Sequence, residues 1–328
     1  MSIQIEPLRE THIEDAAELF CIRFRALREH LPLLPARYSA ADTILPMLRD
    51  LSQSAPGVVA IDGRKLTGFL LGFVIPDFLG KRSVFSPEWA NAARLEGSRR
   101  LYQEMYGHLS ADWVADKCFT HLVSLLENDP QGRDAWHWLG FGMAAVDGLR
   151  DLQPVQASSA EFELRRATLE DVGEANLFDQ ALARHLAAPP IFWPHENKEY
   201  AEWLGNSANA LWLAYQAGTS HRAGQERPGN EAVGCLALEP GYQGGCQVTQ
   251  DEKTISITGA YTREGTRGNG VATALLNGSL EWARAEGYER CAVDFEPMNS
   301  LAARFWLKYF QPVCYSLMRK VDERIGET

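Results

Sequence analysis

The sequence lacks the features that mark several large classes of protein. It has no C-x-x-C pair, which predicts reduced thiols in a cytoplasmic protein and argues against a disulfide framework or a bound metal. No apolar run is long enough to cross a membrane, since the longest, residues 66–76, predicts a buried strand. The residues after Met1 do not form a basic segment that leads into an apolar one, so we expect no signal peptide. The six cysteines are scattered: Cys21, Cys118, Cys235, Cys246, Cys291 and Cys314.

Positive charge is also scarce. The chain has 43 acidic residues against 32 Lys and Arg, which gives a net charge of -11 at pH 7. Nucleic acid or an anionic membrane would favour a basic surface, so we expect neither as a partner, whereas an amine acceptor is compatible with this charge. With 328 residues, 45% of them hydrophobic, the chain is long enough for two soluble domains with cores of their own.

One stretch in the second half has a pattern typical of phosphate-binding loops. Arg267–Ala272 reads Arg-Gly-Asn-Gly-Val-Ala and follows Thr254–Thr262, whose β-branched and aromatic residues predict a strand. Val271–Glu286 has the periodicity of a helix, and Gly287 supplies its left-handed end. Cys291–Phe295 predicts the next buried strand. The order strand, glycine loop, helix, strand requires a parallel crossover.

The chemistry of this loop suits an anion. Gly268 and Gly270 let the backbone approach a ligand closely, because neither has a Cβ. The first amides of the following helix have no intrahelical partner and lie at the positive end of its dipole. Arg267 adds a fixed positive charge. The loop is therefore predicted to bind a phosphate or a diphosphate.

Three phosphate-binding motifs compete for this stretch. A P-loop needs Lys and Ser or Thr where Val271 and Ala272 stand. A Rossmann loop needs a third glycine where Thr273 stands; Asp294 does imitate its ribose-binding acid, but too little chain follows for a doubly wound sheet. The third motif, R-G-x-G-x-[GA] opening a helix, matches at every fixed position. The stretch thus resembles motif A of the GCN5-related N-acetyltransferases (GNAT), whose amides bind the pyrophosphate of acetyl-CoA.

The resemblance continues downstream and implies a set of cofactor contacts. Family members often carry Asn-x-x-Ala-x-x-Phe-Tyr after the next strand, and here Asn299, Ala302, Phe305 and Trp306 hold those places. The family uses acetyl-CoA as co-substrate, and the strand before its loop bulges and splays, so that backbone groups contact the pantetheine and the thioester. The residues implied to bind acetyl-CoA are Ala260, Tyr261, Thr262, Arg267, Gly268, Asn269, Gly270, Val271, Ala272, Asn299 and Trp306.

The resemblance also implies direct transfer of the acetyl group to an amine, without a covalent enzyme intermediate. In the family, a loop joining the first two helices lines the acceptor pocket, which makes His185, Phe192 and Trp193 candidate substrate contacts. Asp294 and Glu296 share one face of the strand after the loop. One of them could act as general base, directly or through water, or both could be ordinary solvated acids.

The general acid is where the sequence departs from the family. The usual tyrosine falls on Trp306, whose indole N–H cannot serve as an acid near neutral pH. Tyr309 lies on nearly the same helix face and could replace it, or the thiolate could take its proton from water. We expect an N-acetyltransferase acting on a primary amine of a small molecule or peptide. The alternative is a CoA-binding sensor or scaffold with little turnover.

The two halves of the chain contain an internal repeat. Thr11–Glu14 and Thr168–Asp171 both predict capping boxes, and His30-Leu31-x-x-x-Pro35 recurs as His185-Leu186-x-x-x-Pro190. We therefore predict an α/β (α+β) fold of two tandem GNAT-like domains, each a mixed, mostly antiparallel sheet flanked by helices. Small and polar residues near 153–159 place the domains at residues 1–153 and 160–328.

The first copy differs from the second in its loop. It has no R-G-x-G, and the only glycine just before the corresponding helix is Gly97, followed by Ser98. We expect a degenerate domain without a phosphate loop, which could shape the acceptor cleft or form a homodimer. Each copy also has room for only one strand after Phe141 or Phe310, where the family has two. We therefore expect the two sheets to complete one another across the domain interface.

Overall fold

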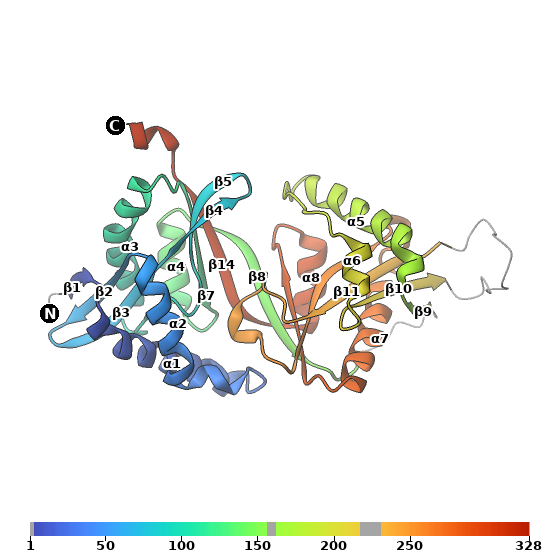
Figure 1. Ribbon diagram of the computed structural model, residues 1–328, viewed down its shortest axis with the longest axis horizontal. Coiled ribbons are helices and arrows are strands. Elements are labelled where there is room, and N and C mark those ends of the chain that lie inside the picture. The colour runs from blue at the N-terminus through green and yellow to red at the C-terminus, as the bar shows by residue number, and fades with distance from the viewer. Residues whose placement is uncertain (1–2, 156–161, 217–230, 328) are drawn as a thin grey trace. The chain divides into compact units, whose positions relative to one another are not determined.

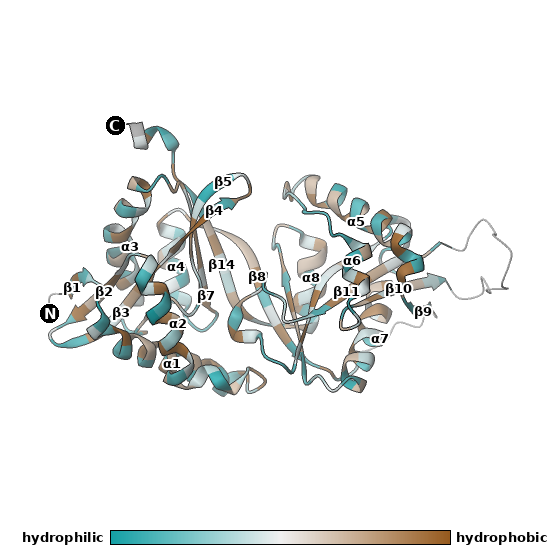
Figure 2. Ribbon diagram, in the orientation of Figure 1, coloured by the Kyte–Doolittle hydropathy of each residue, from teal (hydrophilic) through white to brown (hydrophobic). Residues whose placement is uncertain are grey.

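The computed structural model describes residues 3–155, 162–216 and 231–327 (Figure 1). They form two compact units. The first unit consists of Met1–Asp147, Cys246–Thr249 and Pro312–Thr328, and the second of Gly148–Gly245 and Gln250–Gln311. The boundary predicted near residues 153–159 lies mostly outside the described residues, so the domain limits 1–153 and 160–328 stay a prediction. Apolar residues gather along the strands of each unit, and hydrophilic ones on the outer faces of its helices (Figure 2).

The described strands of the first unit form two sheets, ordered β1-β2-β3-β6 and β4-β5-β7-β14-β8. Its strands are β1 (Ile3–Pro7), β2 (Gly57–Asp62), β3 (Lys65–Leu71), β4 (Phe73–Phe78), β5 (Lys81–Ser86), β6 (Asn91–Ala93), β7 (Thr120–Leu126), and most of β8 (Gly142–Asp151) and β14 (Gln311–Lys320). Its helices are α1 (Ile13–His30), α2 (Ala41–Ser54), α3 (Ser98–Ala115) and α4 (Pro130–Trp138).

The two sheets of the first unit separate at Gly72. The sequence predicts one strand over residues 66–76, but β3 ends at Leu71 and β4 begins in the other sheet at Phe73. A Cβ at Gly72 would lie 2.9 Å from Trp113 Cζ2 and 3.0 Å from Val84 Cγ2. The prediction of a single strand was wrong because hydropathy cannot reveal a close contact with residues distant in sequence.

The second unit contains one mixed sheet in its described residues, ordered β8-β13-β12-β11-β10-β9. β12 and β13 are parallel, whereas β9 to β12 pair antiparallel. Its strands are β9 (Phe162–Arg166), β10 (Ala210–Gln216), β11 (Gly234–Pro240), β12 (Thr254–Thr262) and β13 (Arg290–Phe295). Its helices are α5 (Val172–Ala187), α6 (Tyr200–Gly205), α7 (Val271–Ala285) and α8 (Ser300–Tyr309).

Helices cover both faces of this sheet. Phe178 of α5 and Tyr200 of α6 pack in one apolar cluster with Cys235 of β11. The neighbouring Gly234 faces the other way, where a Cβ would lie 2.8 Å from Val271 Cγ1 of α7. Because side chains alternate along a strand, α5 and α6 lie on one face and α7 on the other. Glycine at position 234 allows α7 to begin close to the sheet.

The C-terminal strand belongs to the first unit. β14 pairs antiparallel with β7, from Cys314 opposite Leu126 to Lys320 opposite Thr120. Conversely, Gly148–Asp151 at the end of β8 belongs to the second unit, next to β13 in the strand order. Most of β8, residues 142–147, remains in the first unit, and the expected completion of the two sheets by one another stays a prediction.

One of the two predicted capping boxes is present. The Thr168 amide donates to Asp171 Oδ2 at 2.7 Å, and the Glu170 amide donates to Thr168 Oγ1 at 3.3 Å. Thr11 instead lies inside a 3-10 turn, and the Arg9 amide donates to His12 Nδ1 at 3.1 Å. The Thr11 prediction was wrong because this histidine supplies the acceptor that the box would have provided.

Candidate functional site

The site begins where two parallel strands diverge. β12 pairs with β13 from Thr254 to Ile257, and beyond that point it continues beside β11 as far as Thr262. The β11 register shifts here, with Ala237 opposite Gly259 and Leu238 opposite Ile257. Thr258 is therefore the extra residue of a β-bulge, which bends β12 away from β13. The bulge and splay expected from the family resemblance are both present.

The diverging edge of β12 presents backbone groups. The Arg263 amide donates to Val233 O on the β11 side at 2.9 Å. Because hydrogen-bonding groups alternate along an antiparallel strand, the amides and carbonyls of Ala260 and Thr262 face away from β11, toward the opened side. The Thr262 carbonyl accepts a hydrogen bond from Arg267 Nε at 3.1 Å, so the arginine of the loop is tied to this edge.

The glycine loop next to this edge leads into α7. Gly268 and Gly270 have φ of 83° and 92°, in the left-handed region that favours glycine. Gly270 is the N-cap of α7 and has no side chain to accept from the first turn. The first intrahelical bond runs from the Ala274 amide to Gly270 O at 2.9 Å, so by position the amides of residues 271–273 are free to bind a ligand.

Helix α8 supplies the opposite wall. Asn299 is buried and caps α8, with its Oδ1 accepting from the Ala302 amide at 3.3 Å. One face of α8 then presents Phe305 and Trp306, whose ring centroids lie 4.9 Å apart at a near-perpendicular angle. The wall of α8 is therefore apolar beyond its polar cap.

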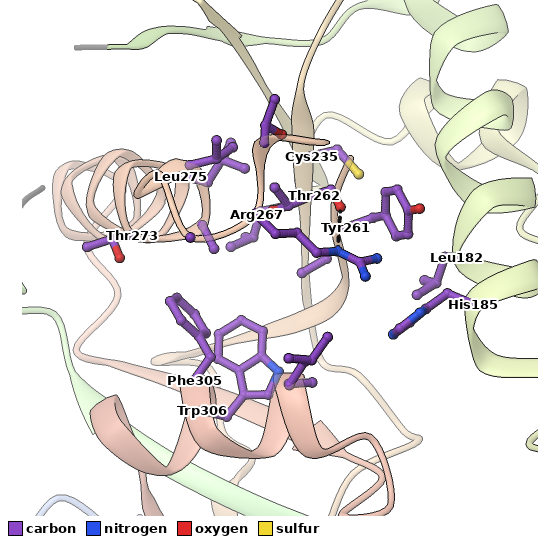
Figure 3. Close-up of a pocket in the computed structure, with 18 of the residues that line it drawn as sticks. Leu182, His185, Cys235, Tyr261, Thr262, Arg267, Thr273, Leu275, Phe305 and Trp306 are labelled. Atoms are coloured by element: carbon purple, nitrogen blue, oxygen red, sulfur yellow. Dashed lines mark hydrogen bonds between the residues drawn. The ribbon is translucent and has the colours of Figure 1, made fainter. Parts of the chain in front are cut away.

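These parts enclose a cavity of about 350 Å³ (Figure 3). Its lining includes every residue implied by the sequence to bind acetyl-CoA except Asn269, which is exposed beside the loop, and it includes His185. In the close-up, Arg267 extends between Tyr261 and the α8 wall, and His185 lies at the α5 side. Lining residues absent from the sequence-based set are Leu182, Cys235, Leu236, Thr266, Thr273, Leu275, Leu301, Ala302 and Phe305.

Part of this chain matches a known protein family. Residues 179–310 match the family described as Acetyltransferase (GNAT) family, and this match contains all the cavity-lining residues. This segment is a GNAT domain.

Solved structures extend the likeness to the whole chain. A GCN5-related N-acetyltransferase from Sphaerobacter thermophilus is 12% identical, with a TM-score of 0.56 over 97% of this chain and 95% of that one. The GCN5-related glucosamine N-acetyltransferase region of a fungal multi-domain GH3 β-N-acetylglucosaminidase is 12% identical, with a TM-score of 0.50 over 97% of this chain and 38% of that one. The predicted fold class, two tandem GNAT-like domains, is thereby confirmed.

Three further findings on this chain are negative, and they concern curated relatives, membrane crossing and metal binding in turn. A comparison with curated proteins gives no significant match. Among the described residues, no helix has the length and apolar character that a membrane crossing requires. The same residues contain no group of His, Cys, Asp and Glu side chains arranged to hold a metal ion.

The two predicted acids of the GNAT domain lie just past the divergence. Asp294 follows Val293, the last β13 residue paired with β12. Burial raises the pKa of Asp294 to about 7, and the neighbouring charge of Glu296 adds to this rise. Burial also raises the pKa of Glu296, an effect that nearby His195 opposes. Neither acid is among the cavity-lining residues, and their catalytic role stays a prediction.

A polar cluster near these acids was missed by sequence reasoning. We define the α5–α6 cluster as Asp179, His195, Lys198, Glu239 and Thr258. The buried Asp179 accepts from His195 Nε2 at 2.9 Å and from the Lys198 amide at 3.2 Å. These residues come from α5, the stretch before α6, β11 and β12, so no local pattern could have grouped them.

The predicted proton donor, Tyr309, lies at the last turn of α8. Burial alone would raise the pKa of Tyr309, but hydrogen bonds with Thr273 and Lys308 outweigh it and lower the pKa. Thr273 lines the cavity in the first turn of α7, whereas Tyr309 does not line it. A role in proton transfer stays a prediction.

Of the three residues predicted to contact the acceptor, His185 lines the cavity, whereas Phe192 and Trp193 do not. The His185 ring lies 6.3 Å from the ring of Tyr261, and both line the cavity. Phe192 is 69% exposed, and Trp193 is partly buried with its amide bonded to Leu186 O at 2.9 Å. Neither aromatic side chain lines the cavity, so their contact with a substrate stays a prediction.

Proposed function

We propose that the GNAT domain transfers the acetyl group of acetyl-CoA to a primary amine of a small molecule or peptide by direct attack. The observation that carries this proposal is the cavity itself. It joins the amides at the start of α7 to the opened edge of β12, within one cavity. Diphosphate binding and thioester positioning are thus available side by side.

The residues present fit acetyl-CoA. The amides of residues 271–273 and the Arg267 guanidinium would hold the diphosphate, through charge-assisted hydrogen bonds worth about 1.5–3 kcal/mol each. The backbone groups of Ala260 and Thr262 would hold the pantetheine and orient the thioester carbonyl. Phe305 and Trp306 would exclude water from the apolar side of the arm.

The attacking amine must lose a proton. We assign this step to Asp294, whose pKa of about 7 allows it to be deprotonated in the resting domain and to hold a proton during transfer. Glu296 acts on this step by raising the pKa of Asp294. Tyr309 is the proposed proton donor to the leaving thiolate, because its lowered pKa and its bond with Thr273 place an acidic hydroxyl beside the cavity wall.

Calorimetry with CoA and a thiol-release assay across a panel of amines test the proposal together. We expect CoA to bind and at least one primary amine to release thiol from acetyl-CoA. Binding without turnover on any acceptor would instead support the sensor or scaffold function. Absence of binding would contradict both.

We further propose that the first unit is a degenerate GNAT-like domain that does not bind CoA. Its α3 also starts after a left-handed glycine, Gly97, but Ser98 is wholly buried and donates to Asp129 Oδ1 at 2.9 Å. Asp129 caps α4 as Asn299 caps α8, and Arg23 lies 4.0 Å from its Oδ2. A carboxylate at the helix start would repel a phosphate.

The number of CoA molecules bound per chain tests this difference. We expect about one, because α7 presents its first amides to the cavity, whereas the start of α3 is occupied by the bond from Ser98 to Asp129. Isothermal titration of the full chain measures the number directly. A value near two, with similar affinities, would contradict the degenerate role of the first unit.

A further inference from the structure

Lys198 has an unusual position for a lysine. Its Nζ donates to Thr258 Oγ1 at 3.1 Å, lies 3.6 Å from Glu239 Oε2, and sits 4.6 Å from the centroid of the Trp203 ring. Its side chain is only 23% exposed. Surface lysines are usually mobile and hydrated, whereas this amine is held inside the domain by Thr258, Glu239 and Trp203.

The partner that matters most is Thr258. It is the bulge residue at which β12 leaves β13, and it precedes the cavity-lining Ala260 by two residues. Two strand residues span about 6.6 Å. The Lys198 amine is therefore anchored next to the segment that would position the thioester, and rotation about its four-carbon stem can bring it closer.

The residues around Lys198 also favour loss of a proton from its ammonium group. Burial lowers the pKa of Lys198, although Glu239 and Asp179 oppose this effect. The neutral form of this amine is therefore more populated at a given pH than that of an exposed lysine. Glu239, which also accepts from Trp203 Nε1 at 2.9 Å, is the carboxylate placed to take the first proton.

We propose that Lys198 is a self-acetylation site, modified by acetyl-CoA bound in the cavity of the same domain. This inference rests on the function proposed above. Lys198 Nζ, after passing one proton through Glu239 to solvent, forms a bond to the thioester carbonyl carbon. The carbon–sulfur bond breaks, and the second amine proton goes to the thiolate. The products are Nζ-acetyl-lysine and free CoA thiol.

Acetylation would change the α5–α6 cluster. The ammonium charge would disappear, together with the ion pair to Glu239 and the cation–π contact with Trp203. Glu239 would keep the Trp203 N–H as a donor but lose its cationic neighbour. Acetylation of Lys198 would therefore leave the α5–α6 cluster with a more negative net charge.

The experiment is peptide mass spectrometry on the full chain after incubation with acetyl-CoA, alongside calorimetry on the same preparation. Lys253, on the turn before β12, is the internal control for non-enzymatic acetylation. We expect occupancy at Lys198 at least tenfold above Lys253, at a rate independent of protein concentration. We also expect the rate at Lys198 to rise at a lower pH than the ordinary pKa of a lysine, because burial lowers the pKa of Lys198.

Variants separate the outcomes. Lys198→Arg should remove the added acetyl mass while CoA still binds, whereas Lys253→Arg should leave it unchanged. Gly270→Asp should reduce Lys198 occupancy to the level of Lys253. If acetyl-CoA binds but Lys198 is modified no faster than Lys253, or only at a rate that rises with protein concentration, the inference is overturned and the proposed function stands. If acetyl-CoA does not bind at all, the proposed function itself fails.

Discussion

Gly270→Asp should weaken CoA binding about 100-fold or more, equivalent to about 2.7 kcal/mol. Position 270 has a φ of 92°, and it is the N-cap from which the free amides of α7 begin. A side chain there would stand where the diphosphate is proposed to lie, and its carboxylate would compete for the same amides. Isothermal titration with CoA measures the loss.

Gly287→Asp is the matched control for this variant. Gly287 follows the other end of α7 with a φ of 89°, and a Cβ there would meet nothing within 4 Å. The same substitution in nearly the same backbone conformation imposes a similar strain, about 1–2 kcal/mol, far from the amides. We expect affinity within about twofold of the parent. A folded Gly270→Asp protein that binds CoA as tightly as Gly287→Asp would refute the diphosphate site.

Asp294→Asn should lower kcat/KM about 10²–10⁴-fold, the usual contribution of a general base. In the parent protein the rate should rise with pH through about 7, because the carboxylate must be deprotonated to accept a proton and burial raises its pKa to that value. The variant should lose this rise and keep only the titration of the acceptor amine. A pH–rate profile with a saturating excess of acetyl-CoA measures both effects.

Glu296→Gln distinguishes the two acids. Removing the Glu296 charge should lower the pKa of Asp294, so the rise should move to lower pH while most of the activity remains. Glu281→Gln, on the exposed face of α7, should change neither the rate nor the profile. If Glu296→Gln abolished turnover and Asp294→Asn did not, the base would be Glu296.

Asp294→Asn should also stabilise the fold, although it lowers activity. A carboxyl whose pKa is higher in the folded than in the unfolded state costs stability as pH rises above its unfolded value, and the full cost is present above about pH 7. Asp294→Asn should therefore raise the free energy of unfolding by about 4 kcal/mol at pH 8, with almost no difference at pH 3, below the unfolded pKa. Denaturant unfolding at both pH values measures this.

Local sequence was enough to predict the central part of the GNAT domain. The strand Thr254–Thr262 was predicted with its observed limits, and the helix from Val271 with an end one residue too late. These elements depend on β-branched residues, helical periodicity and glycine at positive φ, which are properties of neighbouring residues. The bulge at Thr258 was expected only through the family resemblance, because no residue type in the strand requires it.

Contacts between distant residues explain what sequence could not supply. Gly72, where the strand breaks, packs closely against Trp113 and Val84, and the α5–α6 cluster joins residues from Asp179 to Thr258. The raised pKa of Asp294 likewise follows from burial, which a sequence pattern does not record. Each of these features exists only once the chain has folded and water has been excluded.

By itself, the sequence determined that a glycine loop opens a helix after a strand. Backbone conformation at these positions depends on a few adjacent residues, so the loop and the helix start could be recognised without a structure. Tertiary structure alone decided that β12 and β13 separate to form the cavity wall, and that the last strand, β14, pairs with β7 of the first unit. Strand pairing is decided by hydrogen bonds between segments far apart in the chain, and those are set only by the complete fold.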